Sequence, residues 1–265
     1  MKLEKKDELI RNEYRIYRLM DNQMEGFAKV HAITKGNGRK SIVLDLLGPS
    51  VEHLFNARHR RFKVSTLLLL AGQMIKRLKD LHRSNIVHRN IRPEHFVVGR
   101  GASSNTVFLV DFAEAEYLKS FHFCLSDKIP ASLWYASINA HRGFEQSRRD
   151  DMESLGYVLI YFWTGSLPWQ GLSAINKREL NKKILAMKTS TPISKLCEGL
   201  PIHFTHYMIH CRKLAFGQLP DYDLLSELFR MLRVMNHIDD HRPIFELEED
   251  RAAEVNNVQD IIVID

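Results

Sequence analysis

The alternation of hydrophobic and polar positions predicts an N-terminal helix followed by a hairpin. Over residues 7–20 the apolar side chains recur at helical spacing. The positions on this shared face are Leu9, Ile10, Tyr14, Tyr17 and Met20. Two apolar runs, 26–34 and 41–47, flank an Asn-Gly pair at 37–38, which favours a β-hairpin. The Gly-Asn-Gly triplet lacks a third glycine and a following helix, so we interpret it as a turn rather than a phosphate loop.

The rest of the chain is typical of a mainly helical unit with a few short strands. Residues 65–84 have the pattern of an amphipathic helix, and residues 151–163 are apolar on nearly all sides, which predicts a helix buried at the centre. Further helical patterns lie around 174–188, 202–213 and 221–235, and short extended segments lie at 86–88, 96–99 and 107–112. This order predicts an α+β protein with a small N-terminal lobe and a larger helical lobe.

Composition narrows the class of protein. The chain has 265 residues, of which 45% are hydrophobic and 26% charged, so it can bury a core of one large domain or two lobes. Disordered, collagen-like and mini-protein classes are excluded. The net charge of +6 suits an acidic or phosphorylated protein partner. The positive charges are spread along the chain, so we expect no specific nucleic-acid binding.

The lack of a recognisable targeting signal and the pattern of cysteines predict an intracellular protein. The N-terminal segment is charged and has no apolar signal region, and the longest apolar stretch, Leu155 to Trp163, is shorter than the roughly 20 residues of a membrane span. Three widely spaced cysteines fit free thiols in a reducing compartment. We therefore expect a soluble monomer in the cytoplasm, the nucleus or both.

The candidate chemistry lies in segments that occur in a fixed order. They are IVHRNIRPEHF (86–96), DFA (111–113), YASIN (135–139), and EQSRRDDMESLG (145–156) with LPWQG (167–171). Together they resemble a eukaryotic protein kinase, although either triplet HRN or DFA alone is a weak signal. The segments LDLLGPS (44–50), YASIN, EQSRRDD and GSLPWQGL are similar to the casein kinase 1 family. The resemblance extends from Lys2 to about Met235.

The resemblance implies a bilobal kinase fold and transfer of the ATP γ-phosphate to protein serine or threonine. It divides the chain into an N-lobe at 1–46 that lacks its first strands, a C-lobe at 47–241 and an acidic tail at 242–265. Such transfer requires Mg²⁺ on the phosphates, a nearby cation and a carboxylate that orients the attacking hydroxyl.

The same resemblance assigns the cofactor-binding residues. Asp111 corresponds to the metal-binding carboxylate, with a turn aspartate as the alternative reading. Lys2, in MKLE, corresponds to the phosphate-binding lysine on a strand, with Glu13 as its helix partner; the alternative is a solvated lysine. Adenine is expected against the backbone of Asp45 to Leu47, beside Leu44 as gatekeeper.

The catalytic loop departs from the family pattern H-R-D-x-K-P-D-N. Asn90 stands at the position of the catalytic aspartate, and an amide cannot accept the proton that a general base removes, a contribution of ~10²–10⁴-fold. Arg92 replaces a lysine and keeps its charge on a planar group. His95 replaces the asparagine that binds the second Mg²⁺, an ion that prefers oxygen ligands. Ala113 replaces a glycine and restricts the backbone. We expect weak catalysis and weakened binding of ATP and Mg²⁺.

Two hypotheses follow from this mixture of kept and lost residues. His88, Arg89 and Asp151, which in the family tie the catalytic loop to the core, are retained. The glycine-rich loop G-x-G-x-x-G does not occur and would precede residue 1. The first hypothesis is a pseudokinase or strongly impaired kinase that acts as a scaffold or competitor. The second is a working serine/threonine kinase whose start codon is assigned too far downstream.

The resemblance to the casein kinase 1 family also implies a basic site that recognises acidic or phosphorylated substrates. Lys177 and Arg178 match part of that site, and the alternative is a solvated helix start. Trp134 stands where the family has an arginine, and Ser173 where it has a lysine. These changes predict altered substrate recognition.

Two further patterns remain ambiguous. The terminal IIVID (261–265) resembles a SUMO-interaction motif, but a strand that packs on its own domain, or a frayed end, is the preferred interpretation. His206 with His210, and His237 with His241, have a spacing that clasps zinc on a helix. Neither pair has the glutamate of H-E-x-x-H or an evident third ligand, so ordinary histidines are the preferred interpretation.

Overall fold

The computed structural model describes residues 2–20, 24–36, 39–118, 125, 128–239 and 242–245, and excludes the side chains of 2–6, 36 and 39. Its helices are α1 (Lys2–Leu19), α2 (Val51–Ala57), α3 (Val64–Arg83), α4 (Ile138–His141), α5 (Arg148–Thr164), α6 (Lys177–Ser190), α7 (Ile193–Leu196), α8 (Ile202–Lys213) and α9 (Tyr222–Met235), with 3₁₀ turns η1 (Pro93–His95) and η2 (Gly101–Ser103). Its strands are β1 (Val30–Gly36), β2 (Arg39–Leu44), β3 (Ile86–Val87), β4 (Phe96–Val98), β5 (Val107–Leu109) and β6 (Glu116–Tyr117).

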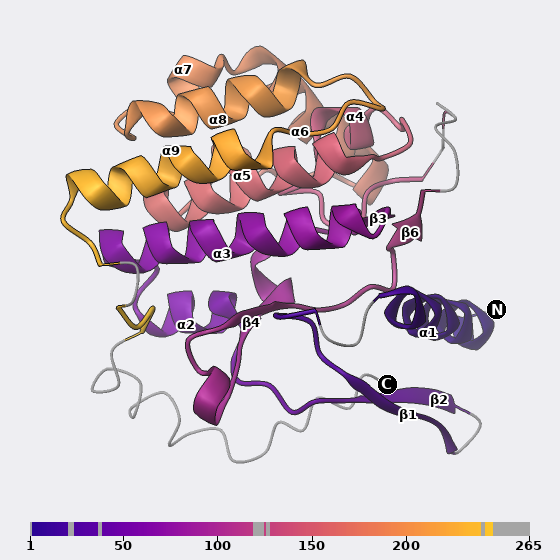
Figure 1. Ribbon diagram of the computed structural model, residues 1–265. Helices are drawn as coiled ribbons and strands as arrows, with labels where there is room; N and C mark the ends of the chain where they lie inside the picture. Colours follow the sequence, from indigo (N-terminus) through magenta and orange to yellow (C-terminus); the bar gives the residue numbers. More distant parts are fainter. Residues whose placement is uncertain are drawn as a thin grey trace.

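The predicted α+β class is confirmed. A small region with α1 and the β1–β2 hairpin lies beside a larger, mostly helical part (Figure 1). The hairpin pairs Ile33 with Ile42 and Gly36 with Arg39, as the Asn-Gly signal predicts. The turn residues 37–38 lie outside the described residues. Strands β3–β6 and β4–β5 form two further antiparallel pairs in the described chain.

The strand predicted at Lys2 is wrong. The backbone of α1 is helical from Lys2 onward, so the amphipathic pattern seen over 7–20 extends to the start of the chain. Lys2 and Glu13 then share one helix, separated by roughly 16 Å of helical rise, because each residue adds about 1.5 Å. The predicted pair required a lysine on a strand next to a glutamate on a separate helix. Two residues this far apart along one helix do not fit that pairing.

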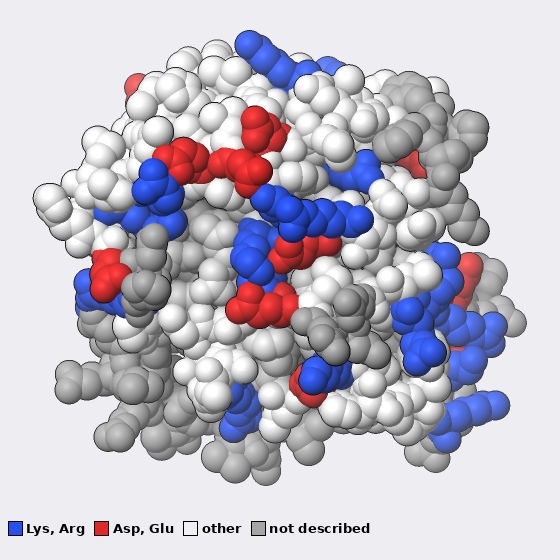
Figure 2. Space-filling model, viewed as in Figure 1, with Lys and Arg blue, Asp and Glu red and all other residues white. Residues whose placement is uncertain are grey.

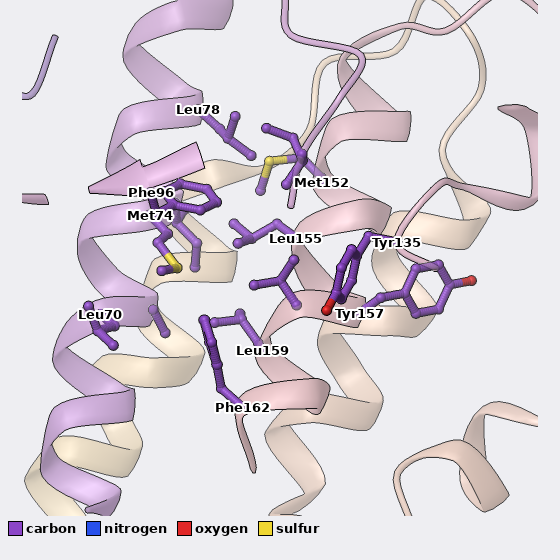
Figure 3. Close-up of a cluster of buried hydrophobic side chains, with 14 of the residues drawn as sticks. Leu70, Met74, Leu78, Phe96, Tyr135, Met152, Leu155, Tyr157, Leu159 and Phe162 are labelled. Atoms are coloured by element: carbon purple, nitrogen blue, oxygen red, sulfur yellow. The ribbon is translucent and has the colours of Figure 1, made fainter. Parts of the chain in front are cut away.

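Helix α5 forms the centre of the larger part, as its all-apolar pattern predicts. Every residue from Asp150 to Phe162 is buried. Figure 3 shows Met152, Leu155, Leu159 and Phe162 on one side of α5, and the residues that face them come from α3 and β4. These are Leu70, Met74, Leu78 and Phe96. Burial of such side chains contributes about 1.5–3 kcal/mol each.

A single glycine allows α5 to lie close to α8. A Cβ added at Gly156 would lie 2.4 Å from the Sδ of Met208, closer than atoms of side chains approach. The ends of α5 are also specified locally. Ser147 and Asp150 form a capping box at its start, and Gly165, with φ of 80°, ends it. These features fix the position of the residues at the N-terminus of α5, which support the candidate site.

Short strand pairings bring together the segments that hold the candidate site residues. The β4–β5 pair places residues 88–95, which precede β4, next to residues 111–113, which follow β5. Isolated bridges extend this pair on both sides, from Phe27 to Leu109 of β5 and from Ser50 to Val97 of β4. Helices α2, α4 and α7 were not predicted because each is too short to show a hydrophobic period.

Charges of both signs lie side by side across the middle of the face in Figure 2. Ion pairs of this kind include Lys76 with Glu25 and Asp80, and Lys79 with Asp223.

Among the described helices, none combines the length and the apolar character that a bilayer span requires.

Candidate functional site

The carboxylate of Asp151, at the start of α5, holds the loop that follows β3. Its Oδ2 accepts hydrogen bonds from the backbone N–H of His88 at 2.7 Å and from Nε2 of His82 at 2.9 Å. Its Oδ1 accepts one from the N–H of Arg89 at 2.8 Å, and Arg89 adopts a positive φ of 67°. The tie predicted for His88, Arg89 and Asp151 is therefore present. His82 was missed because it belongs to the α3 pattern and to no motif.

His88 fixes this loop to the strand that leads to Asp111. Its Nε2–H donates to the carbonyl of Val110 at 3.1 Å, and its ring is fully buried. Burial, together with the nearby charge of His95, lowers the pKa of His88 to about 4. The ring is therefore neutral near neutral pH and acts as a structural link.

Asn90 lies between these anchors and η1. Its backbone carbonyl accepts a hydrogen bond from Nδ1 of His95 at 2.9 Å. Its side-chain Oδ1 is buried and has no hydrogen-bond partner among the described residues. A buried amide oxygen without a partner can accept a hydrogen bond from a ligand, for example from a hydroxyl group.

Arg92 and Glu94 form a bidentate pair within the same segment. The guanidinium Nε donates to Oε2 of Glu94 at 2.8 Å, and the second bond joins Nη2 to Oε1. Burial alone would raise the pKa of Glu94, but the hydrogen bonds from Arg92, a backbone hydrogen bond and the nearby positive charges together hold the pKa below its ordinary value. The predicted cation and this carboxylate thus neutralise each other.

His95 and Asp111 were both predicted near the metal, and they lie together as a pair. Nε2 of His95 is 2.9 Å from Oδ2 of Asp111. Oδ1 of Asp111 accepts a hydrogen bond from the N–H of Ala113 at 3.3 Å, and Asp111 adopts a positive φ of 65°. Burial alone would raise the pKa of Asp111, but the hydrogen bond and charge of His95 lower it to about 2. Asp111 is therefore a carboxylate.

The side chains in this arrangement do not fit Mg²⁺. The ion requires oxygen ligands in near-octahedral geometry. Nε2 of His95 lies against Oδ2 of Asp111, Oδ1 of Asp111 accepts a hydrogen bond from the N–H of Ala113, and Nδ1 of His95 faces the carbonyl of Asn90. In the described part of the chain, no group of three or more His, Cys, Asp or Glu side chains is placed to hold a metal.

Helix α1 is docked against the segment after β5 through polar contacts. Oε1 of Glu13 accepts from the N–H of Phe112 at 3.1 Å, and the Glu13 side chain is buried. Burial, followed by the negative charge of Asp111, raises the pKa of Glu13 to about 7. The Nδ2 of Asn12 donates to the carbonyls of Ala113 and Ala115, both at 2.9 Å. Asn12 was missed because an exposed-looking asparagine carries no motif.

The predicted adenine segment follows β2. The Asp45 carboxylate accepts hydrogen bonds from the N–H of Lys29 at 2.9 Å and from Nε2 of His31 at 2.7 Å, so it stabilises the hairpin. Leu44 is half-buried against the core, and Leu47 is half-buried. The peptide groups of Leu47 make no hydrogen bond to the described residues, so they can face a purine.

The predicted substrate-recognition residues and histidine pairs lie outside the segments at 88–95 and 111–113. Lys177 and Arg178 are exposed at the start of α6. Trp134 is 46% exposed, and its carbonyl accepts from Nε1 of Trp169 at 2.7 Å. His210, of the first histidine pair, accepts a bond from the N–H of Asp221. His241 and the IIVID segment lie outside the described residues.

A comparison with protein families agrees with this geometry. The family model of the protein kinase domain matches residues 1–218, well over half of the chain. Protein kinase domains generally use ATP and Mg²⁺ and act on protein substrates. The match includes α1, the loop at 88–95, the segment at 111–113 and α5. The chain therefore belongs to the protein kinase domain family.

Proposed function

We propose that this protein is a casein kinase 1-like serine/threonine kinase homologue whose phosphotransfer is lost or strongly impaired. Its role is that of a scaffold, or of a competitor for the partners of an active relative. The subfamily assignment is supported by LDLLGPS, YASIN, EQSRRDD and GSLPWQGL, which lie along the matched region.

The observation that carries the proposal is the state of the carboxylates around Asn90. The amide at position 90 cannot accept the substrate proton. Glu94 is held by Arg92, and Asp111 is held by His95. Neither of these carboxylates is therefore free to replace the missing base. The loss is ~10²–10⁴-fold in rate, or roughly 3–5 kcal/mol in the barrier.

The orphaned Oδ1 of Asn90 suits binding without turnover. It can accept a hydrogen bond from a substrate serine or threonine hydroxyl, which would satisfy a buried acceptor. The hydroxyl then keeps its proton and remains a poor nucleophile. A protein substrate can thus dock and leave unchanged, which is the behaviour of a competitor.

The contacts that support the fold favour a scaffold over a collapsed remnant. Asp151 retains its bonds to the loop, and α1 remains docked through Asn12 and Glu13. We expect adenine against Asp45 to Leu47, and the peptide groups of Leu47, which face no described partner, support this expectation. The exposed Lys177 and Arg178 support an acidic or phosphorylated protein as partner.

A phosphotransfer assay tests the loss of activity. Purified protein with radiolabelled ATP and casein is expected to show turnover far below the ~1–100 s⁻¹ of active kinases. Asn90→Asp combined with His95→Asn restores two of the four altered family residues and is expected to raise the rate by at least ~10²-fold. Asn56→Asp, the same chemical change on the exposed side of α2, is the matched control and leaves the rate unchanged.

The same assay separates the alternative, a working kinase. Positioning and electrostatics dominate phosphoryl transfer, so an enzyme without a base can retain activity. Normal turnover of the unmodified protein, abolished by Asp111→Ala, would establish that alternative. The competitor role has its own measurement: adding this protein to an active casein kinase 1 should raise the apparent KM for casein and leave kcat unchanged.

A further inference from the structure

The hydroxyl group of Tyr222, at the start of α9, begins a series of hydrogen bonds that ends at the candidate loop. It lies 2.8 Å from Nδ1 of His82, on α3. Nε2 of the same ring lies 2.9 Å from Oδ2 of Asp151, whose two oxygens also accept the backbone N–H groups of His88 and Arg89. Three helices, α9, α3 and α5, therefore contribute one side chain each to a continuous path toward the loop.

The contact between the hydroxyl group and the ring does not depend on the protonation of His82. A hydroxyl group donates to a bare ring nitrogen and accepts from a protonated one. The His82 side chain is 1% exposed, and a buried polar atom requires a partner. In the described part of the chain, Nδ1 has no partner besides Tyr222. Removal of the hydroxyl group therefore leaves one side of a buried ring unsupported.

The backbone at both ends of this contact is held independently of it. At the end of α3, the carbonyl of His82 accepts a hydrogen bond from Nε of Arg148 at 3.4 Å. At the start of α9, the N–H of Asp221 donates to Nε2 of His210 at 3.3 Å. The aromatic ring of the tyrosine packs against the core, a contact that phenylalanine keeps. The hydroxyl group thus fixes the orientation of the imidazole ring rather than the position of either helix.

The place of Asn90 depends on the same path. Asn90 directly follows Arg89, whose N–H donates to Oδ1 of Asp151 at 2.8 Å and whose φ is 67°. A non-glycine residue persists in this left-handed region only where its surroundings hold it. A shift of the Asp151 carboxylate therefore changes the direction in which the backbone leaves Arg89, and with it the position of the Asn90 side chain.

We propose that Tyr222 is a positioning residue, which acts through the His82 ring on the loop that carries Asn90. The hydroxyl group orients the ring, the ring supports the carboxylate at the start of α5, and the carboxylate holds the loop in the form that accepts a substrate serine or threonine hydroxyl. This inference rests on the proposed function, because docking at Asn90 is part of it. It gives a role in that docking to a helix that contributes no residue to the segments at 88–95 and 111–113.

Hydrogen exchange of the full chain tests this role. In Tyr222→Phe the amides of residues 88 and 89 should exchange about three- to tenfold faster than in the unmodified protein, because a hydrogen bond that supports their acceptor is lost. The amides of residues 155–162, further along α5, should keep their rates. Tyr207→Phe is the matched control: it removes a buried hydroxyl group that donates to the carbonyl of Met152 at 2.9 Å, and it should leave exchange at 88 and 89 unchanged.

A double-variant cycle separates positioning from a general loss of stability. His82→Leu removes the ring, so Tyr222→Phe should have no further effect on exchange at 88 and 89 in that background. If His82→Leu does not fold, nitrogen NMR of the His82 ring in Tyr222→Phe takes its place. The Nδ1 signal of that ring should shift, while the ring signals of His206, exposed on α8, should not.

Competition with an active casein kinase 1 gives the functional readout. Tyr222→Phe should require about three- to tenfold more protein than the unmodified chain to raise the apparent KM for casein equally. If the unmodified chain does not compete at all, the competitor role fails, and the exchange data still decide the role of Tyr222. Unchanged exchange at 88 and 89, faster exchange spread evenly over α5, additive effects in the cycle, or an unmoved ring signal would each overturn that role.

Discussion

Oε1 of Glu13 accepts a hydrogen bond from the backbone N–H of Phe112 at 3.1 Å, which joins the first helix to the segment that carries Asp111. The bond links residues 99 positions apart and orients α1 toward the candidate site. Its acceptor is a buried carboxyl whose pKa is raised to about 7, first by burial and then by the charge of Asp111. The contact therefore positions α1 while carrying an electrostatic cost above neutral pH.

Glu13→Gln is expected to stabilise the protein at alkaline pH. The folded pKa of about 7 exceeds the ordinary 4.5, so the stability that Glu13 contributes is present at low pH and is lost as the pH rises through 7. Glutamine keeps an acceptor for Phe112 without the buried charge. Urea unfolding at about pH 8 should show a gain of roughly 1–3 kcal/mol. The gain should shrink at about pH 5; a loss at both pH values would contradict the assignment. Glu8→Gln, on the exposed side of α1, is the control.

Asn12→Asp is expected to loosen α1 from the segment after β5. The amide donates to the carbonyls of Ala113 and Ala115, and a carboxylate in its place would repel both oxygens. Two unpaired, partly buried carbonyls should cost about 1–3 kcal/mol in unfolding free energy. Hydrogen exchange should accelerate at residues 112–116. Arg15→Ala, which removes only an exposed bond to Asn12, should leave that exchange rate nearly unchanged.

The elements predicted best from the sequence were those in which the local pattern of hydrophobic residues agrees with the packing of the whole fold. The all-apolar pattern at 151–163 marks a helix buried on every side, and α5 is such a helix. The Asn-Gly pair and its flanking runs mark the β1–β2 hairpin. The strand at Lys2 was inferred from alignment with a family motif, whereas the local pattern of charged and apolar residues is helical there.

The candidate site was only partly predictable, because sequence motifs do not show how side chains pair. His95 and Asp111 were each assigned to a metal, and the structure joins them to each other. Residues that complete the site from other elements, such as His82 and Asn12, carry no motif of their own. Lys188 was also missed, since a lysine on an amphipathic helix is usually solvated.

Lys188→Met is expected to destabilise the loop before α4. The Nζ amino group is fully buried, which lowers the pKa of Lys188 well below its ordinary value, and it donates to the carbonyls of Ala136 at 2.6 Å and Leu133 at 3.3 Å. It also lies 4.5 Å from the centre of the Tyr157 ring. Methionine fills the space but leaves both carbonyls unpaired, a cost of about 2–4 kcal/mol. Thermal and urea unfolding measure it, with Lys182→Met on the exposed face of α6 as control. An equal effect of the two variants would show that the buried amino group is unimportant.

His141 makes the protein sensitive to acid. Nδ1–H donates to Oδ1 of Asn181 at 2.6 Å, and Nε2 accepts a bond from Nζ of Lys188 at 3.1 Å, so the folded ring is neutral. Burial, followed by the charge of Lys188, lowers its pKa from 6.5 to about 3. Between these values the unfolded chain binds a proton that the folded chain does not, so stability falls as the pH is lowered from about 6.5 toward 3.

The size of this effect can be measured by difference. One proton taken up on unfolding changes the unfolding free energy by about 1.4 kcal/mol per pH unit. His141→Gln removes the titrating ring, so the slope of its unfolding free energy against pH should be lower than that of the unmodified protein by about this amount between about pH 4 and 6. His206→Gln alters an exposed ring and should retain the full slope. Because Glu13 and Asp150 have raised pKa values and act in the opposite direction, only the difference between slopes isolates His141. Parallel curves for the two variants would mean that the folded ring accepts a proton as readily as the unfolded one, and that the bond from Lys188 does not hold Nε2 unprotonated.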